Sequence, residues 1–241
     1  MKTFIVTGST KGIGLALVKK LQSTYSDTTI YMSYAHDEAA AQECYNELSK
    51  TGSVFIDKVD MSSYESAKAY CDKIKADGAK IDGLLLNAGI GYKASIEDMS
   101  MDEWERVMRC NLNVPVYMIQ QLLPILNEGS SIVMAGSMMG DYPHSGSLVY
   151  GVSKAGVHAC VKNMTKFLDG RNIRINAVAP GFTKSEWHAG KSQEFFDRIA
   201  SKVAVHRWAE SEEIADAYIF LLENQFMNGA VLNINGGYSY F

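Results

Sequence analysis

The chain has 241 residues, 47% of them hydrophobic, and a net charge of -4 at pH 7. This length and apolar content predict a single domain over 1–241 with a core on both faces of a sheet. The acidic balance and the lack of a basic cluster in the sequence argue against nucleic acid as the main partner. The first residues include too few consecutive apolar side chains for a signal peptide or a membrane span, so we expect a cytoplasmic protein with no membrane partner.

The cysteines give no sign of a metal centre. Cys44, Cys71, Cys110 and Cys160 are widely spaced, with no C-x-x-C pair and no adjacent histidine. This pattern disfavours zinc and suggests reduced, mostly packed thiols. We therefore expect no metal in the functional site.

The first half of the chain alternates strand patterns with helix patterns. A short apolar strand over Lys2–Val6 runs into a glycine-rich turn and a helix that begins near Ile13. A later helix should be capped by Ser62 together with Glu65, and its Ala67, Cys71 and Ile74 should face inward. The remaining patterns predict strands over 29–34, 54–59 and 81–86, and a helix over 37–50 that Gly52 closes.

The second half continues the alternation. Ser100 with Glu103 should cap a long helix, which Pro115 is expected to kink soon after Asn111. The last strands are predicted over 132–135, 173–178 and 231–234. Together these elements predict an α/β fold: a Rossmann-type, doubly wound parallel sheet of about seven strands with helices on both faces. Right-handed crossovers then bring the carboxyl ends of all strands, and the motifs that follow them, to one edge.

A glycine-rich turn follows the first strand, in the run Thr7-Gly8-Ser9-Thr10-Lys11-Gly12-Ile13-Gly14. Glycines without Cβ atoms let a ligand approach the backbone, and the helix that follows directs its N–H groups at that ligand. A pyrophosphate suits such a site. The spacing is G-x-x-x-G-x-G and not the G-x-G-x-x-G of the general dinucleotide fingerprint, so a plain loop is the alternative interpretation.

Tyr150 and Lys154 lie one helical turn apart and therefore share a face. A nearby ammonium favours the phenolate and lowers the pKa of a tyrosine from about 10. Such a tyrosine can donate or accept a proton near neutral pH. The Y-x-x-x-K spacing alone is a weak signal, because pairs of this kind often lie on a solvated helix face.

Five motifs recur in order along the chain. They are T-G-x-x-x-G-x-G from Thr7 to Gly14, Asn87-Ala88-Gly89 after an apolar strand, Ser137, the Tyr150 and Lys154 pair, and Pro180-Gly181. In this order they resemble the short-chain dehydrogenase/reductase family, and most of all its branch of 3-oxoacyl-acyl-carrier-protein reductases and related ketone reductases. The resemblance implies an enzyme that interconverts a ketone and a secondary alcohol with a nicotinamide cofactor, while Tyr150 transfers the proton.

The resemblance also assigns catalytic roles. Ser137 would donate a hydrogen bond to the substrate carbonyl, although a serine after a strand often caps a turn instead. Lys154 would lower the pKa of Tyr150 and bind the nicotinamide ribose. Asn111 would hold a water that links Lys154 to solvent; alternatively, its amide satisfies backbone groups freed by the kink at Pro115.

The cofactor is expected along the sheet edge. By resemblance, Asp60 would bind the adenine, and Asn87 would stabilise the sheet beside the cofactor without being catalytic. The residues expected at the cofactor are Gly8, Ser9, Lys11, Gly12, Ile13, Gly14, Ser33, Tyr34, Asp60, Met61, Asn87, Ala88, Gly89, Tyr150, Lys154, Pro180, Gly181 and Thr183.

The end of the second strand bears on the choice between NADP and NAD. An NAD enzyme places an acid about twenty residues past the glycines, whereas this chain has Ser33-Tyr34-Ala35-His36 there. Asp37 and Glu38 come late and fit a helix cap and a first-turn charge. Lys11 could meet a 2′-phosphate, or could simply be solvated in its loop. We expect NADP, with NAD as the alternative.

The segment from about 185 to 205 corresponds to the variable substrate lid of the family. Its aromatic side chains could contact an apolar substrate or could pack the lid down. We expect Ser137, Tyr142, His144, Tyr150 and Trp187 to line the substrate site. For Tyr142 and His144 the alternative is packing within their own loop.

The substrate class rests on the resemblance. Arg171 matches one basic position that docks an acyl carrier, but the turn Asn127-Glu128-Gly129-Ser130 lacks the other. A free ketone, steroid-like ketones included, is therefore the rival of a carrier-bound substrate. A nucleotide sensor without turnover is a further alternative, and the retention of the four catalytic positions disfavours it.

The tail 229–238 resembles a family C-terminus that packs across a two-fold axis. We therefore expect a homotetramer. By the same analogy, the helices around Asn111 and Tyr150 should form a second interface.

Overall fold

The computed structural model describes residues 1–143, 146–185, 187 and 189–238. Seven strands form one sheet in the order β3-β2-β1-β4-β5-β6-β7, and every neighbouring pair is parallel. The strands are β1 (Lys2–Val6), β2 (Thr28–Tyr34), β3 (Ser53–Lys58), β4 (Ile81–Leu86), β5 (Leu126–Ala135), β6 (Arg174–Pro180) and β7 (Val231–Ile234). The predicted doubly wound, Rossmann-type sheet is confirmed.

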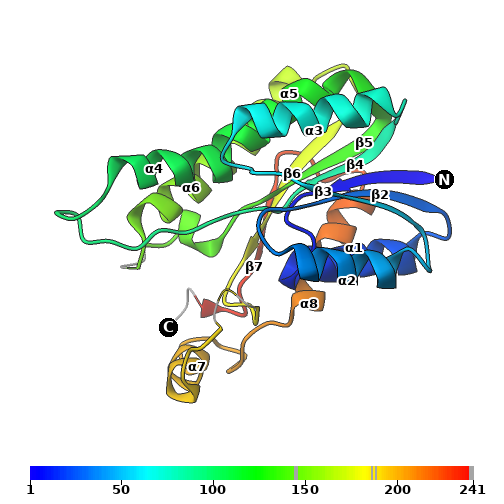
Figure 1. Cartoon of the computed structure of the whole chain (residues 1–241). Coiled ribbons are helices and arrows are strands. Elements are labelled where there is room, and N and C mark those ends of the chain that lie inside the picture. Colours follow the sequence, from blue (N-terminus) through cyan, green and yellow to red (C-terminus); the bar gives the residue numbers. More distant parts are fainter. Residues whose placement is uncertain (144–145, 186, 188, 239–241) are drawn as a thin grey trace.

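Helices cover both faces of the sheet (Figure 1). The helices of one layer are α1 (Gly12–Thr24), α2 (Glu38–Leu48) and α8 (Ser211–Glu223). Those of the other layer are α3 (Tyr64–Ala76), α4 (Met101–Met108), α5 (Val114–Leu122) and α6 (Leu148–Phe167). A further helix, α7 (Gln193–Ala200), stands apart from both layers and lies below the sheet in Figure 1.

The sheet separates two apolar cores, because side chains alternate along its buried strands. In β4, Leu84 and Leu86 face one core and Leu85 faces the other. The inward-facing residues predicted for α3 are all fully buried in the first core: Ala67, Cys71 and Ile74. A core on each face holds the sheet as a firm frame for the loops at its carboxyl edge.

The start of α3 differs from the prediction by one residue. Ser63 is the N-cap, and its hydroxyl accepts a hydrogen bond from the Ser66 N–H at 3.2 Å. Ser62 bonds elsewhere: both its N–H and its hydroxyl donate to the Asp60 carboxylate, at 2.8 and 2.7 Å. The capping box predicted at Ser62 is therefore wrong, because Asp60 forms a local turn that takes Ser62 out of the cap position.

The long helix around Asn111 is interrupted by a π-helical turn, Arg109–Asn113, which joins α4 to α5. Pro115 has no N–H to donate to the carbonyl of Asn111, four residues earlier. The N–H of Val114 bonds to the Arg109 carbonyl, five residues back, which is the π-helical pattern. The irregularity therefore begins before Asn111, earlier along the chain than predicted.

Two further elements depart from the sequence patterns. β5 begins at Leu126, well before the predicted start at 132, and its pairing with β4 shifts register between Ile81 and Gly83. The patterns did not include α8, whose signal is a capping box between Glu210 and Glu213. Within the described residues, no helix combines the length and the apolar character needed to cross a membrane.

Candidate active site

The turn between β1 and α1 depends on its glycines. Gly8 and Gly12 adopt positive φ angles of 61° and 50°. A Cβ on Gly14 would lie 2.1 Å from the Gly8 carbonyl oxygen and 2.8 Å from Asn87 Nδ2. Among the described residues, no side chain caps α1 and no acid lies in its first turn. The first-turn N–H groups are therefore available to an anionic ligand.

The carboxyl end of β4 is tied to this turn. Asn87 Nδ2 donates to the carbonyls of Thr7 and Gly8 at 3.2 and 3.1 Å, and the Ala88 N–H donates to Thr7 Oγ1 at 3.0 Å. The strand order reverses between β1 and β4, and doubly wound sheets bind ligands at this point. Asn87 thus makes the structural contacts expected of it beside the candidate cofactor cleft.

Tyr150 and Lys154 share a face of α6, and Lys154 Nζ lies 5.5 Å from the centre of the Tyr150 ring. Lys154 is only 2% exposed, and its Nζ donates to the carbonyl of Ala135, the last residue of β5, at 2.8 Å. Burial lowers the pKa of Lys154 to about 8. The tyrosine therefore has a buried ammonium beside it, as the spacing predicts.

The pKa of Tyr150 differs from the expectation. Burial raises this pKa above its ordinary value, and a hydrogen bond with Ser137 offsets the rise only in part. The predicted net lowering of the Tyr150 pKa is therefore wrong for this structure, because desolvation outweighs the hydrogen bond with Ser137. The phenol is held protonated at neutral pH, which suits a proton donor.

Ser137 lies directly after β5 and touches the phenol. Its hydroxyl caps the short helix η3 (Met138–Gly140) by accepting from the Met139 N–H at 3.2 Å, so the turn-cap interpretation is correct. The same hydroxyl is hydrogen-bonded to Tyr150. Because its oxygen accepts from Met139, the hydroxyl proton of Ser137 can still be donated. The Ser137 hydroxyl can therefore cap η3 and bond to Tyr150 at the same time.

The Asn111 side chain is buried and fully engaged. Its Oδ1 accepts from the Ile90 N–H at 2.9 Å, and its Nδ2 donates to the Ile90 carbonyl at 2.9 Å and to Ser153 Oγ at 3.0 Å. The amide thus satisfies backbone groups of Ile90 and not those freed at Pro115. A Cβ on Gly89 would lie 3.4 Å from both Asn111 Oδ1 and Lys154 Nζ, so the end of β4, Asn111 and Lys154 are close neighbours.

The candidate site lies at the carboxyl ends of the parallel strands. It includes the glycine turn after β1, the segment after β4, and the cluster of Ser137, Tyr150 and Lys154. A family model described as Enoyl-(Acyl carrier protein) reductase matches residues 8–239. The chain belongs to the short-chain dehydrogenase/reductase family. It is an oxidoreductase that acts on CH–OH groups with NAD(P), and a sensor without turnover is not supported.

Individual relatives in the short-chain dehydrogenase/reductase family align over nearly the whole chain. A 3-oxoacyl-acyl-carrier-protein reductase, FabG of Aquifex aeolicus, is 32% identical, covering 98% of this chain and 96% of the relative. A 3alpha-hydroxysteroid dehydrogenase of Mediterraneibacter gnavus is 27% identical over the same shares. The solved Pseudomonas aeruginosa RhlG/NADP active-site complex is 28% identical, with a TM-score of 0.90, and covers 98% of this chain and 96% of that one.

The cleft of this short-chain dehydrogenase/reductase continues along the ends of β2 and β3. Ser9 and Ser33 bind one another: the Ser33 N–H donates to Ser9 Oγ at 3.1 Å, and the Ser9 N–H donates to the Ser33 carbonyl at 3.0 Å. Tyr34 ends β2, and Asp60 and Met61 follow β3. The predicted adenosine-side residues therefore lie at the same edge as the glycine turn.

Lys11 lies beside the end of β2 and forms an ion pair with Asp37. Asp37 is the N-cap of α2, where its carboxylate accepts from the Ala40 N–H at 3.0 Å, as the sequence predicts. Lys11 and this backbone bond lower the pKa of Asp37. The lysine is thus held at the position where the adenosine ribose is expected.

The segment after β6 leaves the same edge of the sheet. A Cβ on Gly181 would lie 2.7 Å from the Cα of Asn235, so only glycine fits beside the chain that follows β7. The Thr183 hydroxyl donates to the Gly181 carbonyl at 3.3 Å, and Pro180 ends β6. The chain after β6 is therefore packed against the chain after β7, at the same edge of the sheet as the glycine turn.

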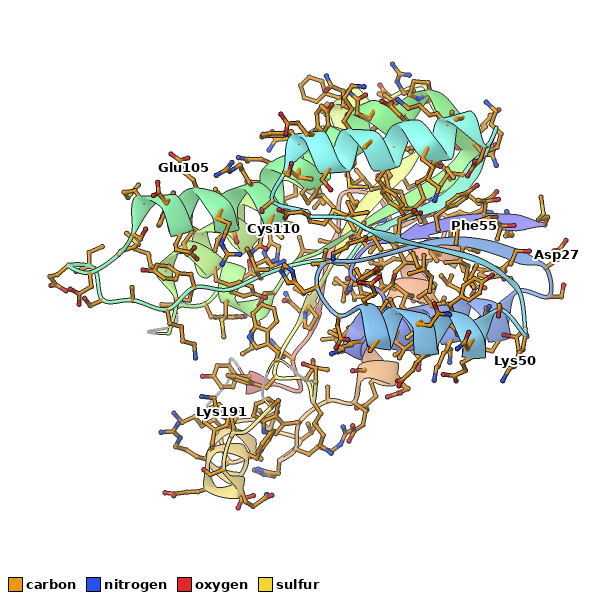
Figure 2. All side chains as sticks on the ribbon, in the orientation of Figure 1. Asp27, Lys50, Phe55, Glu105, Cys110 and Lys191 are labelled. Carbon is orange, nitrogen blue, oxygen red and sulfur yellow. The ribbon has the colours of Figure 1, made fainter. Side chains whose placement is uncertain are left out.

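The aromatic residues of the segment predicted as a lid make two kinds of contact. Phe195 and Phe196 of α7 pack on Trp208, with 5.9 and 4.8 Å between the ring centres, and so hold this segment together. Trp187 is 54% exposed and lies beside Tyr150, with 5.9 Å between the ring centres. Figure 2 shows Lys191 on the same outlying segment as α7, apart from the sheet.

The structure brings three of the five predicted substrate residues together: Ser137, Tyr150 and Trp187. Tyr142 lies on the turn after η3 and is 38% exposed, so its place at the substrate stays a prediction. His144 lies outside the described residues. The sequence patterns missed His158 and Asp141, which contact the Ser137 loop; the available signal was that His158 follows Lys154 by one helical turn.

Proposed function

We propose that this oxidoreductase reduces a ketone, with a 3-oxoacyl thioester as the favoured substrate, to a secondary alcohol using NADPH, and also catalyses the reverse oxidation. The observation that carries the proposal is the contact of Tyr150 with Ser137 beside the buried Lys154. The bound cofactor supplies the hydride for reduction and accepts it in oxidation. We assign the cofactor to the cleft bounded by the glycine turn, the end of β4 and Gly181.

Tyr150 is the proposed proton donor to the substrate oxygen. A tyrosine is protonated at neutral pH, so the phenol carries the proton that reduction consumes. Ser137 donates a hydrogen bond to the same oxygen and stabilises the negative charge that develops there. Lys154 stabilises the phenolate left after the transfer and is proposed to hold the nicotinamide ribose. In the reverse direction the phenolate is the base, so oxidation should gain as the pH rises.

NADP is the proposed cofactor, in preference to NAD. Lys11 supplies a cation beside the end of β2, and the acid next to it, Asp37, is occupied as a helix cap. Ser33 and Tyr34 stand where an NAD enzyme places a carboxylate. RhlG, a relative that aligns over nearly the whole chain, was solved with NADP. A 2′-phosphate would compete with Asp37 for Lys11.

A Tyr150→Phe variant tests the proposed proton donor. We expect it to bind NADPH with nearly unchanged affinity and to lose almost all turnover, because the ring and its packing are kept while the proton is removed. Fluorescence titration with NADPH and steady-state ketone reduction measure the two effects. Retention of more than about a tenth of the wild-type rate, a barrier change under about 1.4 kcal/mol, would move the proton donor to another residue.

The carrier-docking region bears on the substrate. Gly129 N–H donates to the Asn172 carbonyl at 2.7 Å, and Asn172 Nδ2 donates to Glu128 at 3.3 Å. The segment that lacks the second basic residue, which forms the start of β5 and not the expected turn, therefore lies against the turn that bears Arg171. Glu128 places a carboxylate there, which disfavours an acidic carrier. We therefore propose a 3-oxoacyl thioester whose carrier contributes little to binding.

A free hydroxysteroid or other small alcohol is the second candidate, favoured by the incomplete docking region and by the hydroxysteroid dehydrogenase relative. NADPH oxidation with three substrates separates the candidates: a carrier-bound 3-oxoacyl chain, the same chain on a small thiol, and a 3-oxosteroid. We expect similar kcat/KM for both thioesters and a value at least about tenfold lower for the steroid. Turnover of the steroid alone would favour the second candidate.

We further propose that residues 1–241 form a single domain, that the protein acts in the cytoplasm and that it assembles as a homotetramer. Large apolar side chains exposed on two separate faces support the assembly. Met101 of α4 and Leu148 and Val152 of α6 lie on one face. Phe220 of α8 and Phe226 lie on the other.

A further inference from the structure

A buried histidine lies behind Ser137. His158 of α6 is 3% exposed, and its Nδ1 lies 2.9 Å from the Asp141 carboxylate. The Ser137 N–H points at the other ring nitrogen, Nε2, at 3.4 Å. Because Nε2 faces a donor, the ring accepts there and carries its proton on Nδ1, which donates to Asp141. Both nitrogens are therefore used by the loop that carries Ser137.

The loop is shaped around this ring. A Cβ on Gly136 would lie 2.5 Å from His158 Nε2, and a Cβ on Gly140 would lie 2.8 Å from His158 Cε1. The two glycines stand on either side of the segment that begins with Ser137. The imidazole thus fills the space that they leave and bonds to the loop at its start and at its end.

We propose that His158 and Asp141 form a positioning pair for Ser137. Asp141 fixes the tautomer of His158, the acceptor at Nε2 fixes the backbone of Ser137, and the hydroxyl is thereby held toward Tyr150. The inference rests on the proposed role of Ser137 at the substrate oxygen. A misplaced hydrogen-bond donor costs rate even when the fold is intact, since displacements of about 1 Å can lower turnover by about 10²-fold.

Two matched variants separate positioning from packing. His158→Gln keeps an acceptor near the place of Nε2, whereas His158→Leu is of similar size and has none. We expect kcat to fall by about 10- to 100-fold in His158→Leu and by less than about threefold in His158→Gln, with the KM for NADPH unchanged in both. Equal kcat values in the two variants would overturn the proposal, because the acceptor would then have no effect. Thermal unfolding confirms that both variants fold.

A double-mutant cycle tests whether His158 acts through the Ser137 hydroxyl. In a Ser137→Ala background, we expect His158→Leu to lower kcat by less than about twofold, because the group it positions is gone. The same loss in both backgrounds would overturn the proposal. Wild-type turnover by Ser137→Ala itself would refute the proposed role of Ser137, whereas a slow Ser137→Ala with a normal His158→Leu refutes the positioning pair alone.

Asp141 offers a variant with little risk to folding, since its side chain is 36% exposed. In Asp141→Ala, no carboxylate holds the proton of His158 on Nδ1, so the ring can also carry its proton on Nε2. The Nε2–H would then face the Ser137 N–H, and two donors cannot form a hydrogen bond. We expect kcat to fall by about tenfold and the ¹⁵N spectrum of His158 to show a loss of the Nδ1–H form. An unchanged kcat and an unchanged tautomer would remove Asp141 from the pair.

Discussion

The Lys154 ammonium is buried away from water, which destabilises its charged form. Its pKa falls from an ordinary 10.5 to about 8, a difference that corresponds to about 3 kcal/mol of destabilisation of the charged form. Its hydrogen bond to the Ala135 carbonyl returns about 1 kcal/mol of this. We expect Lys154→Met to raise the free energy of unfolding by about 1–2 kcal/mol at pH 7 while lowering turnover by about 10²-fold or more.

The pH dependence of this stability has a defined sign. Between pH 8 and 10.5 the unfolded chain keeps the Lys154 proton and the folded chain loses it, so the wild type gains stability from this group as the pH rises through that window. The advantage of Lys154→Met should therefore shrink toward pH 10. Urea unfolding at pH 7 and pH 10 measures this difference in the free energy of unfolding. A variant less stable than the wild type at pH 7 would show that burial of the Lys154 charge does not destabilise the folded protein.

The environments of single side chains were the least predictable from the sequence. The Y-x-x-x-K spacing correctly placed Tyr150 and Lys154 on one face, yet the shift in the pKa of Tyr150 had the opposite sign, because burial is a property of the fold and not of the spacing. The contact of His158 with Asp141 depends on the path of the loop after β5. Periodicity carries no information on such a path.

The join of β1 to α1 leaves no room for a side chain at Gly14. Alanine is favoured over glycine inside a helix by about 1 kcal/mol, but a Cβ on Gly14 would lie 2.1 Å from the Gly8 carbonyl oxygen. The steric overlap should outweigh the gain in helix propensity, since overpacking costs about 1–3 kcal/mol. We expect Gly14→Ala to lower stability by about 1–2 kcal/mol and to weaken NADPH binding by at least about tenfold, measured by unfolding and by calorimetric titration.

Gly78 provides the control for Gly14. It has a positive φ of 69°, and a Cβ added to it would meet no neighbouring atom within 4 Å, so Gly78→Ala should cost only the backbone strain, about 1–2 kcal/mol. Its affinity for NADPH should equal that of the wild type. A Gly14→Ala protein that is more stable than the wild type, or that binds NADPH normally, would contradict the assignment of this turn.

The elements themselves were largely predictable. Alternating apolar strands and amphipathic helices predicted the parallel sheet, and the strand over Val231–Ile234 was located to the residue. The errors fall where local bonds compete: Asp60 takes Ser62 out of the α3 cap, and Pro115 turns the helix at Asn111 into a π-helical turn. Neither outcome follows from hydrophobic periodicity, because both depend on single hydrogen bonds.

At the scale of the whole molecule, the exposed apolar faces predict assembly. Val152 lies on α6 one helical turn after Leu148, and the two side chains are 40% and 52% exposed. We expect the wild type to be a tetramer by light scattering and Val152→Glu to form smaller species, because an unpaired carboxylate cannot be buried in an apolar interface at low cost. Tyr45→Glu, on the exposed side of α2, should leave the tetramer intact. A monomeric wild type would remove the proposal.

Trp187 reaches Tyr150 from a segment outside the sheet and keeps 54% of its surface exposed, while Trp208 is almost fully buried among the lid aromatics. A molecule that binds against the Tyr150 ring on this side would contact that indole. Binding of such a ligand is therefore expected to change the polarity around Trp187. The fluorescence emission of Trp187 should shift when the site is occupied.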